Sequence, residues 1–237
     1  MPFITGIGWV TVEGMGCGRQ SSHFSMTPGT LPKIRRKSIL DRPFVHFGRM
    51  DDFSRLGLAG IALALKDAGR HEWTAKRPVG MVASTVLGCI QTDMDYFDTV
   101  IQGDDMASPG LFSYTLSNCF LGEAACYFGT NGSSYVIYDP HFAGLTSLSA
   151  LLLNIQLHEY NMGLAGIVNA EPPPDLPLPG KPLPGAAFVM IEKTPPSNET
   201  TYGPIELAQN DTILFNHKEM TSFLHLIQAC VQMFHGI

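Results

Sequence analysis

An acid and an imidazole stand two residues apart in Asp139-Pro140-His141, at the expected junction between a buried strand and an apolar helix. The pKa of an imidazole lies near neutral pH, so His141 suits the role of a general base. The positive end of the helix dipole would keep the ring neutral, which favours the same role. Asp139 would orient His141 only if both lay on one face of a continuing strand. The alternative is that His141 packs or hydrogen-bonds there without a chemical role.

Other candidate groups lack the surroundings that activate them. Ser134, Ser147 and Ser149 do not lie in a GxSxG elbow. No cluster of His, Asp and Glu has the spacing of metal ligands, so we expect no metal. Gly6 and Gly8 lack the third glycine, the prompt helix and the acidic residue of a dinucleotide fingerprint, so we interpret them as part of a turn.

The five cysteines are dispersed, without CxxC spacing. An odd, scattered set indicates free thiols in a reducing compartment, and argues against a disulfide framework or a zinc site. The cysteines are Cys17, Cys89, Cys119, Cys126 and Cys230.

Composition narrows the class of protein. The 237 residues are 45% hydrophobic and 15% charged, which is enough apolar surface for one domain or two small ones. A formal net charge of -6 gives little attraction to nucleic acid or anionic membranes. The apolar run 145–157 is too short to span a bilayer, and the N-terminus does not resemble a signal peptide. We therefore expect a soluble, cytoplasmic protein that binds no nucleic acid and has no membrane span.

Apolar runs bounded by glycine and proline predict alternating strands and helices. Strands are expected at residues 3–12, 79–85, 135–138, 162–169 and 186–192. Helices are expected from Asp51 or Asp52 to Gly69 and at residues 91–101, 111–128 and 143–160. The intervening segment 19–45 is expected to be a surface loop, whose basic residues are solvated or contact an acidic partner. This alternation predicts an α/β layered fold.

The last part of the chain has a different pattern. After a Pro-rich segment at 171–184, residues 194–204 are polar, residues 205–214 favour a strand and residues 218–234 favour a helix. We therefore divide the chain into a domain at 1–193 and a short C-terminal extension at 194–237. The extension is expected to pack on the core or on a partner.

Several short motifs occur in the order in which β-ketoacyl synthases have them. They are Ile4-Thr5-Gly6-Ile7-Gly8, Arg49 to Ser54 followed by Leu56 to Gly69, Val79 to Gly88, Ser108-Pro109 with Thr115 to Asn118 and Gly122, Gly129 to Gly132, and Gly185 to Glu192. Over residues 3–192 the chain thus resembles the N-terminal half of a β-ketoacyl synthase of the thiolase-like superfamily. The resemblance implies a thiolase-like layered fold with a single βαβαβαββ half.

The resemblance also locates the acyl site. In that family a cysteine at the N-terminus of a buried helix carries the acyl chain as a thioester. Gly144 and Leu145 keep the register of that segment, which places His141 at the cysteine position. The resemblance implies that Phe142, Asn118 and Cys119 bind substrate, although Cys119 and its neighbour Cys126 also fit inert buried thiols. No bound cofactor is expected, and the substrate would be a thioester of coenzyme A or phosphopantetheine.

The resemblance does not include the other catalytic groups of the family. Its two histidines, its lysine and its Gly-Phe-Gly loop lie in a C-terminal half. His217, His225 and His235 lack the motifs that surround those groups, so we assign them no catalytic role. The resemblance therefore does not imply condensing activity.

We expect the chain to pair with another chain, because the apolar helix at 143–160 has almost no polar side. A single half would expose one face of that helix. In the family the strand before the cysteine pairs across a two-fold axis. We therefore expect residues 134–138 to do so, in a homodimer or in a heterodimer with a ketosynthase, with an acyl carrier protein as a further partner.

Two functions in fatty-acid or polyketide metabolism follow. The first is an acyltransferase that acts on acyl thioesters with His141 as base. The second is a non-catalytic partner that shapes the pocket of a true ketosynthase, as chain length factors do. A pseudoenzyme fragment with a structural role is a third possibility.

Overall fold

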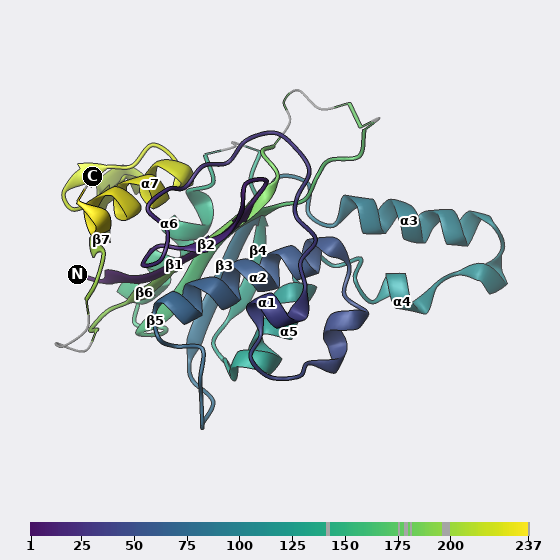
Figure 1. The fold of residues 1–237 in the computed structure, drawn as a ribbon, viewed down its shortest axis with the longest axis horizontal. Helices are drawn as coiled ribbons and strands as arrows, with labels where there is room; N and C mark the ends of the chain where they lie inside the picture. Colours follow the sequence, from purple (N-terminus) through teal and green to yellow (C-terminus); the bar gives the residue numbers. More distant parts are fainter. Residues whose placement is uncertain (141–142, 175, 178–179, 181, 196–199, 237) are drawn as a thin grey trace.

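The computed structural model describes residues 1–140, 143–174, 176–177, 180, 182–195 and 200–236 (Figure 1). In these residues nine strands form one sheet. The strands are β1 (Phe3–Thr11), β2 (Gly14–Cys17), β3 (Val79–Thr85), β4 (Ser134–Tyr138), β5 (Met162–Asn169), β6 (Gly185–Glu192), β7 (Gly203–Leu207), β8 (Ile213–Phe215) and β9 (Lys218–Glu219). The strand order is β4-β3-β5-β6-β1-β7-β8-β9, and β2 pairs with β1.

Helices cover both faces of this sheet and one pair projects from it (Figure 1). The α-helices are α1 (Arg36–Ile39), α2 (Asp52–Asp67), α3 (Ile90–Ile101), α4 (Pro109–Phe112), α5 (Cys119–Phe128), α6 (Thr146–Gln156) and α7 (Phe223–His235). Short 3-10 turns are η1 (Val45–Gly48), η2 (Asp104–Met106) and η3 (Gln209–Asp211). The predicted α/β layered architecture is therefore present.

The central strands are buried on both faces, because alternate residues enter two different cores. In β6, Phe188 and Met190 join the core formed with α2 and α5. Their neighbours Val189 and Ile191 join the core formed with α6 and α7. A strand covered on both sides has no polar face, which explains the continuous apolar runs in the sequence.

Glycines let α2 lie directly on β1. A Cβ at Gly8 would come within 2.2 Å of the Ala64 backbone nitrogen, and one at Gly6 within 2.4 Å of the Ala64 carbonyl oxygen. The interpretation of Gly6 and Gly8 as a turn is therefore wrong, since both lie inside β1. They serve close packing between a helix and a strand.

The ends of α2 follow the signals in its sequence. The Asp51 carboxylate accepts a hydrogen bond from the Ser54 amide, as an N-cap does. Beyond the last turn, Gly69 has a φ of +67°, which glycine adopts without strain. This helix therefore matches the expectation.

Several other expectations need correction. Residues 14–17 form β2, which pairs with β1 and lies outside the expected strands. The segment expected as one helix at 111–128 is split into α4 and α5, because Ser113–Asn118 leave the helix. The central helix α6 is shorter than the expected 143–160. The strand expected at 205–214 is a hairpin of β7 and β8, and α7 begins at Phe223 because residues 218–219 form β9.

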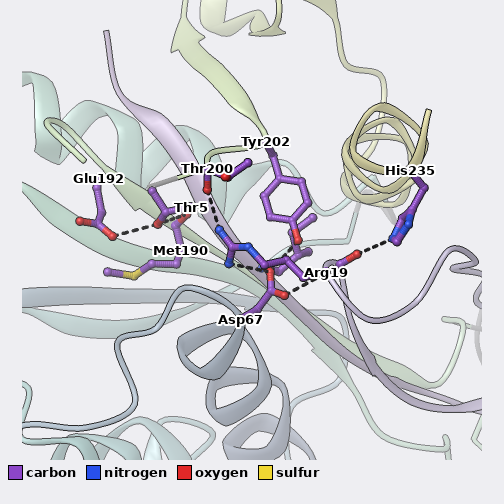
Figure 2. A network of polar contacts seen from close by, with 10 residues as sticks. Thr5, Arg19, Asp67, Met190, Glu192, Thr200, Tyr202 and His235 are labelled. Atoms are coloured by element: carbon purple, nitrogen blue, oxygen red, sulfur yellow. Dashed lines mark hydrogen bonds and ion pairs between the residues drawn. The ribbon is translucent and has the colours of Figure 1, made fainter. Parts of the chain in front are cut away.

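The C-terminal residues pack against the same sheet. β7 pairs with β1, and α7 places Phe223, Ile227 and Cys230 in the core that contains α6. A polar network adds to this contact (Figure 2), in which Asp67 at the end of α2 accepts hydrogen bonds from the Tyr202 hydroxyl and the Arg19 amide. The face of α6 that lies against α7 is therefore covered within the chain, although Leu153 on α6 stays 46% exposed.

Candidate functional site

The parallel strands β4, β3 and β5 bring their carboxyl ends to one edge of the sheet. In open α/β sheets ligands bind in the crevice outside this edge. Asn169 at the end of β5 accepts a hydrogen bond from the Val86 amide at 2.9 Å. The Thr85 hydroxyl at the end of β3 accepts one from the Gly88 amide at 3.0 Å. These bonds hold the loop that follows β3.

The predicted base and its neighbour, His141 and Phe142, lie outside the described residues. Asp139 before them is 6% exposed, and its amide donates to the Thr85 carbonyl at 2.8 Å. Its carboxylate accepts a hydrogen bond from the Thr146 hydroxyl in the first turn of α6. Asp139 therefore joins the end of β4 to the start of α6, the two elements on either side of His141.

The turn into α6 is tightly packed. Gly144 has a φ of +68°, and a Cβ there would lie 2.5 Å from Ile167 Cγ2 on β5. The Ala143 carbonyl accepts a hydrogen bond from the Phe223 amide at 2.7 Å. The C-terminal helix α7 thus begins against the turn that carries the predicted site.

The two other predicted substrate residues begin α5. The Asn118 side chain is exposed, and the Cys119 thiol lies 3.1 Å from the Ser113 carbonyl oxygen. Burial raises the pKa of the Cys119 thiol, with a smaller contribution from the charge of Asp51. Neither residue lines the cleft described below. Their role in substrate binding stays a prediction.

A hydrogen-bonded set that the sequence did not single out lies beside this edge. The Ser117 hydroxyl lies 2.7 Å from the Tyr138 hydroxyl and 3.4 Å from the Cys89 sulfur. Gly88 makes this possible, because a Cβ there would stand 2.2 Å from Ser117 Oγ. The residues come from three separate stretches of sequence, so no local pattern indicated the set.

A cleft of about 840 Å³ opens next to Cys89. Its volume falls in the range of small-molecule sites. The walls are the loop 30–34, the first turns of α2 and α3, Leu111 and the loop 170–174. Lys33 and Arg55 line it together with Asp52, Asp95 and Glu171, so its charge is mixed. The Glu171 carboxylate accepts a hydrogen bond from the Leu31 amide, which joins two of the loops.

Burial raises the pKa of four thiols, those of Cys17, Cys89, Cys119 and Cys230, which makes them poor nucleophiles at neutral pH. Burial raises the pKa of Cys89 to about 11, with a further contribution from Asp93. Burial likewise raises the pKa of Cys17 to about 11 and that of Cys230 well above its ordinary value. A raised pKa keeps the thiol protonated, and the thiolate is the reactive form. Within the described ranges, no group of His, Cys, Asp and Glu is arranged to hold a metal ion.

Strand β4 forms an open edge of the sheet. Among the described residues β3 is the only strand that pairs with it. Its residues are half-buried up to Ile137, and Tyr138 is 61% exposed. The expectation of a buried strand at 135–138 is wrong in this respect. Unpaired edge groups are a template for strand addition.

Similar solved structures identify this arrangement. A ketosynthase in complex with its chain length factor from Xenorhabdus doucetiae superposes with a TM-score of 0.60 at 15% identity, over 82% of this chain and 80% of that chain. A β-ketoacyl synthase from Burkholderia phymatum gives 0.61 at 16% identity, over 86% and 62%. A type II polyketide ketosynthase in complex with its acyl carrier protein gives 0.68 at 16% identity, over 87% and 67%.

The chain has the thiolase-like fold of β-ketoacyl synthases. No protein-family model matches the sequence, and no curated protein matches it. The chain covers only 44% of a ketosynthase from a bacillaene synthase of Bacillus amyloliquefaciens, and about two thirds or less of several others. In the described part of this ketosynthase fold, no helix is long and apolar enough to cross a membrane.

Proposed function

We propose that this chain is a non-catalytic, chain-length-factor-like partner of a ketosynthase in fatty-acid or polyketide metabolism. The observation that carries the proposal is the open β4 edge. It lies where the family resemblance predicts pairing, and β4 presents half-buried side chains from Ser134 to Ile137 and an exposed one at Tyr138. A partner strand would satisfy the outer backbone groups of β4 and cover these side chains.

The state of the cysteines supports a non-catalytic role. The family resemblance implies that His141 stands at the acyl-accepting position, and acyl-imidazole is labile to water. The described thiols with shifted pKa values are all shifted upward. A chain without an activated thiol is a poor store for an acyl group.

A structural match supports the same proposal. The matched chain of the Xenorhabdus doucetiae complex superposes on 82% of this chain, over 80% of its own length. That complex joins a ketosynthase to a chain length factor. The fold of this chain is therefore compatible with assembly beside a ketosynthase.

Co-purification tests the proposal. The chain would be co-expressed with each ketosynthase of its source organism, and complexes would be sized by light scattering. We expect a 1:1 complex with one of them. If the chain stays monomeric with every ketosynthase, the proposal is wrong.

A proline substitution in β4 tests whether the partner pairs with the open edge of this strand. The Met81 amide bonds the Ser133 carbonyl and the Asp139 amide bonds the Thr85 carbonyl, so the alternating ladder leaves the Val136 amide facing outward. Val136→Pro therefore removes an outward donor and no bond to β3. We expect it to abolish the complex, whereas Val136→Ala keeps the amide and the complex.

Acyl transfer with His141 as base is the second candidate. Asp139 favours it, because a buried carboxylate lies at the end of β4, two residues before His141. Acyl-carrier and coenzyme A thioesters would be incubated with the chain and an acceptor. Turnover that His141→Ala abolishes would support this candidate and would contradict the non-catalytic role.

A further inference from the structure

Residues 90–116 form a helical arm that projects from the body (Figure 1). It contains α3, η2 and α4, and its two helices are held together. The Tyr96 and Phe112 rings lie 5.4 Å apart, and the Ser108 amide donates to the Thr99 hydroxyl at 3.1 Å. The arm is therefore an ordered element and not an extended loop.

The arm carries large apolar side chains that face solvent. Met94 is 43% exposed, Phe97 is 61% exposed and Ile101 is 65% exposed, and they follow the i, i+3, i+7 spacing of one helix face. Phe112 in α4 is 60% exposed, and Leu116 at the end of residues 90–116 is 66% exposed. The sequence predicted the stripe on α3 correctly, but the structure does not bury it. An exposed apolar surface of this kind marks a contact with another protein.

The charged residues of the arm itself are all acidic, although Asp95 also lines the cleft that contains Lys33 and Arg55. Asp95, Asp98 and Asp105 are exposed on the arm. The sequence contains no lysine or arginine between Arg77 and Lys181, a segment that includes the arm, α5, β4 and α6. The acidic side chains of the arm therefore have no basic neighbour within their own stretch of chain.

The arm is also joined to the open edge. The hydrogen bond between Ser117, directly after the arm, and Tyr138 connects it to the end of β4. A two-fold contact between two copies at β4 would use the same patch on both, and this patch belongs to the segment without lysine or arginine. A contact of the arm with the basic loop 33–42 of another copy would have to form twice across a two-fold axis, or else head-to-tail, which gives rings or open chains.

We propose that the arm is a docking element for a partner that presents an apolar groove bordered by lysine and arginine, and that this partner is the ketosynthase and not a second copy. The inference rests on the proposed function and specifies its partner surface. The aspartates would speed association through charge, and Phe97 with Ile101 would fill the groove.

The test compares matched triple variants in the complex found by co-purification. Asp95→Asn, Asp98→Asn and Asp105→Asn remove three charges from the arm. Their controls, Glu72→Gln, Asp211→Asn and Glu219→Gln, remove three exposed charges elsewhere. At low salt we expect association about tenfold slower for the arm variant, and a weaker salt dependence, with the control unchanged. Phe97→Ala with Ile101→Ala should speed dissociation by about tenfold.

The outcomes separate the two proposals. A complex that forms with wild-type kinetics and salt dependence in both arm variants overturns the inference and leaves the proposed function intact. Absence of any complex overturns both. A wild-type homodimer at low salt that the Phe97 and Ile101 substitutions dissociate would show that a second copy occupies the arm, and would also overturn the inference.

Discussion

The Tyr202 hydroxyl donates a hydrogen bond to Asp67 Oδ2 at 2.7 Å, and so joins the C-terminal extension to the end of α2 (Figure 2). Asp67 also accepts from the Ile7 amide at 2.8 Å and the Arg19 amide at 2.9 Å. One buried carboxylate thus connects β1, the chain after β2, α2 and the segment before β7.

Removing the Tyr202 hydroxyl should destabilise the whole fold. Tyr202→Phe keeps the ring, which is 1% exposed, but takes one donor from a buried carboxylate. A hydrogen bond to a charged group contributes about 1.5–3 kcal/mol, so we expect a loss of that size in the free energy of unfolding. Urea denaturation measures it. An unchanged midpoint would show that the remaining donors satisfy Asp67.

Truncating Phe223, the first residue of α7, should destabilise the fold more than Tyr202→Phe does. Phe223 is 0% exposed and lies against the turn before α6. Phe223→Ala should lower the free energy of unfolding by about 3–5 kcal/mol, because it leaves a cavity. Met233→Ala on the same helix removes a side chain that is 56% exposed, so its effect should be small. Equal effects of the two substitutions would contradict the packing of α7 on the core.

Thiol labelling should follow exposure and pKa. Cys126 is exposed, whereas Cys17, Cys89 and Cys230 are buried and have raised pKa values. Iodoacetamide at pH 8 should modify Cys126 first and the three buried thiols only after unfolding. Mass spectrometry of timed digests identifies each site. Fast modification of Cys89 in the folded protein would indicate an activated thiol and would contradict the non-catalytic role.

Stability should fall in alkaline solution. In the folded chain the pKa of Cys17 and of Cys89 is about 11, above the ordinary 9.0, because burial disfavours the thiolate. Below about pH 9 the thiols keep their protons in both the folded and the unfolded chain, so their contribution to stability is fully present. Between about pH 9 and 11 the unfolded chain releases these protons first, so the free energy of unfolding falls. Urea midpoints should be level near pH 8 and lower at pH 10. Cys17→Ser with Cys89→Ser should flatten this dependence, since serine does not ionise in this range.

Local patterns predicted the elements that are buried on both sides. β3, β5 and β6 are buried along nearly their whole length, and their bounds match the expected strands closely. The cap at Asp51 and the glycine at Gly69 likewise defined α2. These signals are readable because each depends on a few adjacent residues. The order of the same motifs also predicted the ketosynthase fold, which the structural matches confirm.

The candidate site was less predictable, because its residues come from separate stretches of chain. Ser117 contacts Cys89 and Tyr138 only after β3 and β4 are paired. His141, which the sequence favoured as the chemical group, lies outside the described residues. The acidic arm was expected only as a helix with an apolar stripe, since periodicity does not tell which partner covers that stripe.

By itself, the sequence determined the layered class and the strands that are buried on both faces. Only the tertiary structure decided that β4 is an open edge, that Gly6 and Gly8 receive α2, and that α7 covers part of α6. The physical reason is the range of the interactions. Periodicity and capping act between neighbours along the chain, whereas edges, close approaches and covered faces depend on which distant segments meet.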